Sequence, residues 1–247
     1  MIETFRFKSG DRQLWGCRAV PQSTPKAVVV LCHGLPSGAP SFPGDEGYPM
    51  LCRRLAENEY LAFHFSFSGC GQSEGSLDLR LWVSDVIAAL NHIESWGCMP
   101  PYAVIGFSAG GATALTAAAI DQRIDPLFLA ATPFDYGFLN LEAYGLDFFQ
   151  HYRDIGLVRD TAITEEQFLA AFRVYDAAKL ASQIHVTNMA IIHGEDDDLV
   201  PTSHAFRIAD AFGGKVKVRM LPGVGHKMRI FSQTIDAIIE QLDEWFL

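Results

Sequence analysis

Residues 102–120 have the sequence YAVIGFSAGGATALTAAAI. The apolar run Tyr102–Phe107 predicts a buried strand, and the alanine-rich run 109–120 predicts a helix. Ser108 lies between them, inside a G-x-S-x-G motif. A sharp strand-to-helix turn here would hold Ser108 in a strained conformation, with its hydroxyl above the edge of the sheet. We therefore expect Ser108 to be a nucleophile, although the motif alone could also be a glycine-rich turn.

Strands and helices alternate on both sides of this turn. Residues 3–8 and 13–20 predict an antiparallel hairpin, and 27–32 a strand covered on both faces. Because helices of ten or more residues separate the later strands, the predicted class is α/β, with a mostly parallel central sheet of about eight strands and helices on both faces. The other expected strands are 61–65, 125–131, 187–193 and 216–221, and the other expected helices are 48–58, 79–95, 203–212 and 227–246.

One connection is much longer than the others. Some 55 residues separate the strands at 125–131 and 187–193, whereas a plain crossover needs far fewer. Within it, residues 164–182 predict a helix with Thr164 as its cap. We expect a single domain over residues 1–247, with a small helical cap inserted at about 133–186. Three of its aromatic residues could line an apolar substrate pocket, or they could simply pack the insertion onto the sheet: Phe134, Phe138 and Phe148.

Composition excludes several classes of protein. Of the 247 residues, 49% are hydrophobic and 19% charged, which excludes general disorder. The formal charge of −10 argues against a nucleic-acid partner and an anionic membrane, which both need a basic face. The five cysteines include no C-x-x-C pair, and no His, Asp or Glu residues show metal-ligand spacing, so we expect no metal and no cofactor. Without a signal-peptide pattern or a long apolar run, we expect a cytoplasmic monomer or homodimer.

A serine hydroxyl needs a base to accept its proton, and the base needs a third group to orient it. The sequence HGEDDDLVP at 193–201 follows a predicted parallel strand and offers four contiguous acids, so the residues alone leave the choice among them open. His226 ends the sequence PGVGH after the last predicted strand, in a loop freed by two glycines. We expect His226 to be the base. The chain order of serine, acid and histidine is that of the α/β-hydrolases.

Further motifs make the chain resemble the serine hydrolases of the α/β-hydrolase superfamily, similar to small microbial carboxylesterases and to prolyl-oligopeptidase-like catalytic domains. His33-Gly34 resembles the oxyanion loop of that family, SGCGQSEG at 68–75 resembles its glycine-rich segment, and 193–201 resembles its acid loop. One departure is Ser68, which stands where the family often has an arginine.

The resemblance implies a role for several residues. It implies that Asp197 is the acid of a Ser108–Asp197–His226 triad. It also implies that the backbone N–H groups of Leu35 and Ala109 form the oxyanion hole.

The expected function is hydrolysis of carboxylic esters of small to medium apolar or aryl acids, through an acyl-enzyme. A thioesterase, an acyl-peptidase or an acyltransferase with the same triad remains an alternative, and a non-catalytic binding protein on this fold is a further one. The loop at 35–48 is expected to rim the site, and it carries no basic cluster that would favour coenzyme A. The expected partner is therefore a small-molecule acyl ester.

Overall fold

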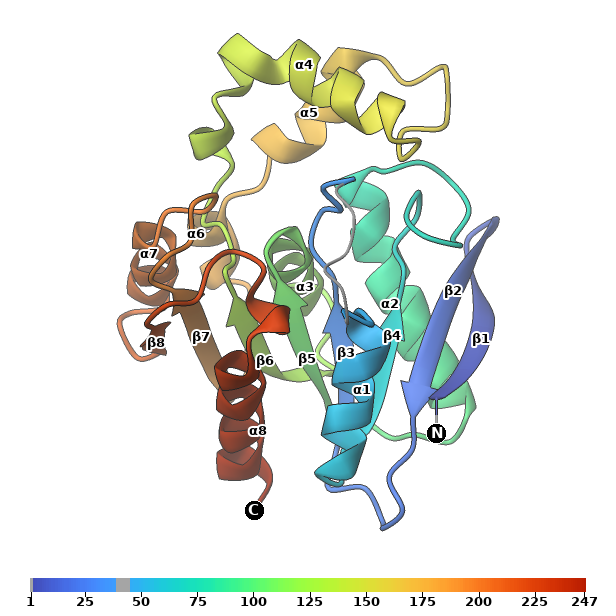
Figure 1. The fold of residues 1–247 in the computed structure, drawn as a ribbon, viewed down its shortest axis with the longest axis vertical. Coiled ribbons are helices and arrows are strands. Elements are labelled where there is room, and N and C mark those ends of the chain that lie inside the picture. The colour runs from blue at the N-terminus through green and yellow to red at the C-terminus, as the bar shows by residue number, and fades with distance from the viewer. Residues whose placement is uncertain (1, 39–44) are drawn as a thin grey trace.

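An eight-stranded sheet runs through the structure, a computed structural model that describes residues 2–38 and 45–247 (Figure 1). The strand order is β1-β2-β4-β3-β5-β6-β7-β8. β2 pairs antiparallel with both β1 and β4, and all other neighbouring strands are parallel, which confirms the predicted fold class. The strands are β1 Ile2–Ser9, β2 Arg12–Ala19, β3 Val28–Cys32, β4 Leu61–Phe65, β5 Tyr102–Phe107, β6 Ile124–Ala130, β7 Met189–Gly194 and β8 Lys217–Leu221.

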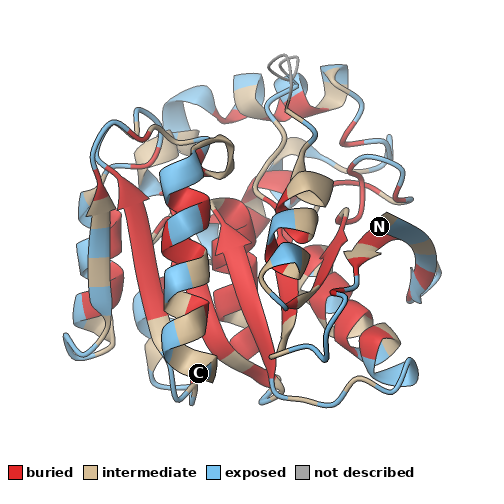
Figure 2. Ribbon diagram, turned by 60° about the horizontal axis from the view of Figure 1, so that its bottom comes forward, coloured by how far each residue is buried: buried red, intermediate tan, exposed pale blue. Residues whose placement is uncertain are grey.

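Helices cover both faces of the sheet. Residues of α1 and α8 share one buried cluster with alternate residues of β3, such as Val29 and Leu31. The intervening residues, Val30 and Cys32, pack in a second cluster with α2, α3 and α7. Figure 2 shows the result, a buried sheet between helices whose outer faces are exposed. The bounds of these helices are α1 Tyr48–Glu57, α2 Leu79–Ser95, α3 Ala109–Ala118, α7 Ser203–Ala211 and α8 Ser232–Phe246.

Two of the expected helices are shorter than the periodicity predicts. The helix expected at 164–182 is divided into α5 Glu165–Arg173 and α6 Ala177–Ala181. Asp176 interrupts it, because its side chain caps α6 and its backbone forms an isolated antiparallel β-bridge with that of Asp135. The helix expected at 227–246 begins only at Ser232, after a short 3₁₀ turn. Residues 227–231 are therefore left in the loop that follows His226, which matters for the site.

The insertion between β6 and β7 contains η1 Gly137–Leu139, α4 Leu141–Asp154, α5 and α6. α4 and α5 lie beyond the end of the sheet at which the parallel strands finish (Figure 1). The Thr164 cap of α5 is present as predicted. Thr164 Oγ1 accepts the backbone N–H of Gln167, and Gln167 Oε1 accepts the backbone N–H of Thr164. The segment after α4 is tied to the loop after β4, since the Arg159 guanidinium donates to the carbonyls of Ser73 and Gly71. Among the described residues, no helix is long and apolar enough to cross a membrane.

Candidate active site

The turn between β5 and α3 holds Ser108 in a conformation that L residues rarely adopt. Its φ is 53° and its ψ is −125°, a strained region that persists only where the surroundings enforce it. The flanking glycines are needed for space. A Cβ on Gly106 would lie 2.4 Å from Cα of Gly111, and one on Gly110 would lie 2.3 Å from the carbonyl oxygen of His33. Both glycines of the motif therefore permit this turn.

The structure brings Ser108, His226 and Asp197 together from three loops. Ser108 Oγ lies 3.0 Å from Nε2 of His226, and Nδ1 of His226 lies 2.9 Å from Oδ2 of Asp197. A carboxylate can only accept a hydrogen bond, so Nδ1 carries the proton of the neutral imidazole. Nε2 is then free to accept the proton of the Ser108 hydroxyl, which is the arrangement a general base requires.

Asp197 is distinguished from its acidic neighbours by its contacts. Its Oδ1 accepts the backbone N–H groups of Leu199 and Val200 at 3.0 and 2.9 Å. Its side chain is fully buried. Burial opposes ionisation, but hydrogen bonds from His193 and His226 outweigh it and hold the pKa of Asp197 well below its usual range. The carboxylate is therefore charged at neutral pH.

His193 is a contact that the sequence did not reveal. Its Nε2 lies 3.0 Å from Oδ2 of Asp197 and 2.9 Å from the carbonyl oxygen of Val200. Since both neighbours are acceptors, Nε2 must carry the proton. His193 is fully buried, and its Nδ1 has no partner among the described residues. Oδ2 of Asp197 is thus in contact with two histidines, His193 and His226.

The loop after β3 is shaped by His33. Its Nε2 accepts the backbone N–H of Phe67 at 3.1 Å, and its Nδ1 lies 2.7 Å from the carbonyl oxygen of Gly34. Burial lowers the pKa of His33 to about 4, so the ring is neutral and donates through Nδ1. In a trans peptide the C=O and the next N–H point in opposite directions. Fixing the Gly34 carbonyl on His33 therefore turns the Leu35 N–H away from that ring.

The two backbone groups expected to stabilise an oxyanion have no competing hydrogen-bond partner in the part of the chain that the structure describes. Neither the N–H of Leu35 nor that of Ala109 donates a backbone hydrogen bond to a described residue. Ala109 begins α3, where the helix dipole also favours negative charge. Gly34 packs directly against the serine, because a Cβ there would lie 3.0 Å from Cβ of Ser108.

Ser108 opens into a cavity of about 450 Å³, within the range of small-molecule sites. The cavity is lined by the segment 33–38, by the loop after β4 and by the segment 226–229. The expected rim loop at 35–48 thus takes part at both of its ends, while residues 39–44 of that loop lie outside the described residues. Its lining residues are Leu35, Pro36, Ser37, Gly38, Asp45 and Tyr48. Ser66, Cys70 and Gly71 come from the loop after β4, and His64 and Phe107 come from the strands β4 and β5.

Phe134, Phe138 and Phe148 do not line this cavity. The ring of Phe134 packs under the Arg207 guanidinium at 4.0 Å, and that of Phe138 against His204 at 5.3 Å. Phe148 packs against the rings of Tyr152 and Phe172 at 5.0 and 5.2 Å. Phe134 and Phe138 thus pack against α7, and Phe148 packs against other rings of the insertion. The packing alternative describes their placement, and none of the three is among the residues that line the cavity at Ser108.

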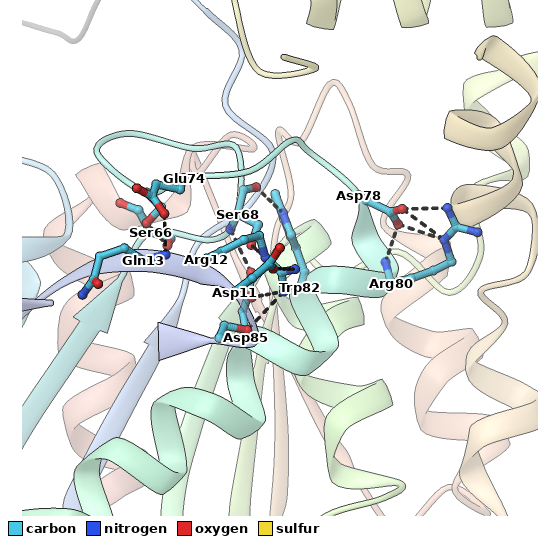
Figure 3. Close-up of polar contacts among 12 residues, drawn as sticks. Asp11, Arg12, Gln13, Ser66, Ser68, Glu74, Asp78, Arg80, Trp82 and Asp85 are labelled. Carbon is cyan, nitrogen blue, oxygen red and sulfur yellow. Dashed lines mark hydrogen bonds and ion pairs between the residues drawn. The ribbon is translucent and has the colours of Figure 1, made fainter. Parts of the chain in front are cut away.

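The departure at Ser68 has a structural counterpart. Figure 3 shows Arg12, from the start of β2, reaching Ser68 and Asp85. Arg12 Nε donates to Ser68 Oγ at 2.9 Å, and Arg12 Nη2 lies 3.5 Å from Oδ1 of the fully buried Asp85. Asp85 Oδ2 also accepts the backbone N–H of Ser68 at 2.8 Å. A guanidinium is therefore present at this place, but the amino-terminal hairpin supplies it.

Two cationic side chains that line the cavity come from the segment after His226, which the sequence analysis did not associate with the pocket. Lys227 and Arg229 follow His226 and line the cavity, as does Asp45. The loop at 35–48 itself has no basic cluster, as expected. The only signal in the sequence was their proximity to His226. Among the described residues, no group of three His, Cys, Asp or Glu side chains could hold a metal ion.

Comparison with known proteins assigns the class. A family profile described as alpha/beta hydrolase fold matches residues 27–189, more than half of the chain. The chain therefore belongs to the alpha/beta hydrolase fold family. It is 31% identical over 116 residues to a monoglyceride lipase of Rattus norvegicus. That alignment covers 45% of this chain and only 36% of the lipase.

Solved structures with the same fold span the whole chain. A carboxyl esterase from Bacillus coagulans superposes with a TM-score of 0.73 at 15% identity, covering 100% of this chain and 99% of the esterase. A 2-hydroxy-6-oxo-6-phenylhexa-2,4-dienoate hydrolase from Rhodococcus sp. superposes with a TM-score of 0.69 at 17% identity, covering 98% and 100%. At such identities the likeness concerns the fold alone.

Proposed function

We propose that this protein is a serine hydrolase that cleaves carboxylic esters through an acyl-enzyme. The observation that carries the proposal is the chain of hydrogen bonds from Ser108 Oγ to His226 Nε2, 3.0 Å, and from His226 Nδ1 to Asp197, 2.9 Å. A structural serine has no need of a base oriented by a buried carboxylate. The strained backbone of Ser108 adds support, because such strain clusters at functional sites.

In the acylation step, Ser108 Oγ attacks the carbonyl carbon of the ester, and His226 Nε2 takes the hydroxyl proton. The negative charge that develops on the carbonyl oxygen is stabilised by the N–H groups of Leu35 and Ala109. His226 then gives its proton to the alkoxide oxygen as the carbon–oxygen bond breaks and the alcohol leaves. Asp197 holds the imidazole in the required tautomer and stabilises the imidazolium.

In the deacylation step, water takes the place of the alcohol. His226 removes a proton from the water, whose oxygen attacks the acyl carbon. The second tetrahedral species collapses to release the carboxylic acid, and the proton returns to Ser108 Oγ. Each step conserves protons within the triad and needs no cofactor.

The names of the relatives, a lipase and a carboxyl esterase, support an ester as the substrate. The same triad could open a thioester or an amide, and these remain the alternatives that an experiment must compare. We further propose that residues 1–247 act as one domain in which the insertion caps the site, since α4 and α5 lie beyond the ends of the parallel strands (Figure 1).

The test is hydrolysis of 4-nitrophenyl acetate and butyrate, set against a matched thioester and anilide. We expect ester turnover, with kcat/KM lowered roughly 10⁴-fold or more in Ser108→Ala, because the nucleophile is lost. A fluorophosphonate should label the wild type at Ser108.

Ser203→Ala is the matched control, because Ser203 is exposed and does not line the cavity. It should keep wild-type turnover and labelling. Ester turnover that persists in Ser108→Ala, or a fluorophosphonate that leaves Ser108 unlabelled, would contradict the proposal. Faster acyl transfer from the thioester or the anilide than from the ester would replace the ester with that substrate class.

A further inference from the structure

The segment that follows His226 contributes two cationic side chains to the lining of the Ser108 cavity. Lys227 and Arg229 directly follow His226, and both line the cavity. They lie in the loop that precedes α8, because that helix begins only at Ser232. Arg229 is partly buried, with 21% of its side chain exposed, and a partly buried cation at a site costs desolvation unless it has partners.

Arg229 is held in a fixed orientation. Both of its terminal nitrogens donate to the two carboxylate oxygens of Asp45, Nη2 to Oδ2 at 2.7 Å. Its guanidinium carbon also lies 5.3 Å from the centre of the Tyr48 ring, where a cation is attracted by the ring face. Tyr48 is itself stacked on His64 at 4.6 Å. A guanidinium fixed in this way can bind a ligand without losing further rotamer freedom.

Asp45 does not exhaust the hydrogen-bonding capacity of Arg229. A guanidinium carries five N–H groups, of which Asp45 takes one on each terminal nitrogen. Three remain, and the pair formed by Nε–H and one Nη–H has the spacing of a second carboxylate. Asp45 is itself tied down, because it also accepts the backbone N–H of Gly47 at 2.8 Å.

Three charged side chains line the cavity in the described part of the chain. Lys227 and Arg229 supply two cations, and Asp45 supplies one anion. Burial lowers the pKa of His33 to about 4 and that of His64 well below its usual value, so both rings are neutral near pH 7. The protein as a whole carries a formal charge of −10. The cationic side chains at the cavity are therefore local groups that favour an anionic ligand over a neutral one.

We propose that the ester substrate carries a carboxylate, which Arg229 binds beside the reacting carbonyl. This inference rests on the proposed function and names the substrate class of the same site. The carboxylate occupies the part of the cavity that the segment 226–229 lines. It fixes the ester relative to Ser108, so the charge contributes to positioning as well as to affinity.

The opposing view is that the Asp45–Arg229 pair only holds the loop after His226 in place. That view predicts no discrimination between charged and neutral esters of equal size. Two matched pairs of substrates separate the views. In one pair the alcohol part differs: 4-acetoxybenzoate and 4-acetoxybenzamide. In the other the acyl part differs: the 4-nitrophenyl monoester of adipic acid and that of adipic acid monoamide.

We expect the wild type to hydrolyse the anionic member of at least one pair about tenfold faster in kcat/KM, as one or two hydrogen bonds to a charged group would give. The pair that responds shows which part of the ester carries the charge. Raising the ionic strength from about 20 mM to about 500 mM should reduce the preference, because the screening length becomes shorter than the cavity.

Variants localise the effect. Arg229→Met should lower the preference for the anionic ester to less than threefold, and Arg229→Lys, which keeps the charge, should retain part of it. Lys215→Met is the control, because it removes the same unit charge from an exposed lysine that does not line the cavity. It should keep the wild-type preference.

The outcomes are separable. If the wild type hydrolyses the neutral members as fast as the anionic ones in both pairs, this inference fails while the proposed function stands. If none of the esters is hydrolysed and the fluorophosphonate leaves Ser108 unlabelled, the proposed function fails as well. Should Arg229→Met lose activity on both members of a pair, the wild-type preference and its dependence on salt still decide the matter.

Discussion

The cavity at Ser108 and the insertion between β6 and β7 are built from opposite kinds of side chain. The cavity is lined by histidines, a tyrosine and a paired guanidinium. In the insertion, the rings of Tyr136, Phe148, Phe168 and Phe172 meet one another at 5.1 to 5.9 Å.

The difference teaches how to interpret an aromatic-rich segment. Aromatic rings that find aromatic partners bury a large area and need no ligand. Buried polar groups are not stabilised by burial alone, and each needs a specific hydrogen-bond partner. Side chains such as His33 and Asp197 are therefore fixed by hydrogen bonds before any substrate arrives. Changes at the cavity should act on rate and on pH dependence, and changes in the insertion should act on stability.

The largest expected effect is on the cavity side. Asp197→Asn should lower kcat/KM for 4-nitrophenyl acetate roughly 10⁴-fold. An amide can donate to Nδ1 of His226 and so favour the tautomer whose Nε2 already carries a proton. That tautomer cannot accept the proton of Ser108. Steady-state kinetics measure the loss, and a decrease smaller than tenfold would argue that Asp197 is not the acid.

On the insertion side, Phe172→Ala should lower the free energy of unfolding by about 3–5 kcal/mol, because a fully buried ring leaves a cavity. Urea titration followed by fluorescence measures this. The kcat/KM of Phe172→Ala for a small ester should differ from that of the wild type by less than threefold at a temperature where the variant is folded. Tyr144→Ala is the matched control, because Tyr144 lies on the same insertion with 61% of its surface exposed, and it should stay within about 0.5 kcal/mol of wild type. Equal losses of unfolding free energy in Phe172→Ala and Tyr144→Ala would show that packing of the buried rings is not what stabilises the insertion.

Stability should depend on pH through the cavity histidines. In the folded protein the pKa of His33 is lowered from 6.5 to about 4 by burial. Between these two values the unfolded chain binds a proton that the folded one does not. Stability therefore falls as pH decreases through this window, by about 3 kcal/mol from His33 at most. Buried His64 acts in the same direction.

Urea titrations at pH 7, 6, 5 and 4 measure this dependence. His33→Gln should flatten it, because the variant has no imidazole to titrate. The exposed His185 provides the control, and His185→Gln should keep the wild-type slope. A slope that His33→Gln leaves unchanged would mean that His33 is not the source.

The smallest expected effect concerns His193, a positioning residue behind the acid. His193→Phe removes the donor 3.0 Å from Oδ2 of Asp197 and should lower kcat/KM about tenfold. The acid limb of the pH–rate profile should also move to higher pH, because a carboxylate with one donor fewer stabilises the imidazolium of His226 more strongly. His193→Gln, which can still donate, should restore most of the rate. A lower rate with an unshifted acid limb, not rescued by Gln, would indicate a packing role only.

Much of the fold could be predicted from local patterns. Continuous apolar runs such as Tyr102–Phe107 predicted buried parallel strands because a strand covered on both faces has no polar side. The capping residue Thr164 predicted where α5 begins. The same local signals misjudged where α5 and α8 extend, because helical periodicity continues through residues 174–176 and 227–231, which tertiary contacts hold in other conformations.

For the site, too, local patterns predicted some features, and long-range contacts decided the others. By itself, the sequence determined a strand, a strained serine and a helix, together with an acid loop and a histidine loop in a fixed order, because these depend on glycine spacing and on short-range turns. The residues alone left four adjacent acids open and the resemblance pointed to Asp197, but only the tertiary structure shows Asp197 in contact with His226 and with His193. It also set Arg12 beside Asp85 and paired Arg229 with Asp45 at the wall of the cavity. Such contacts join residues far apart in the chain, and no local pattern encodes which long-range neighbour will satisfy a buried charge.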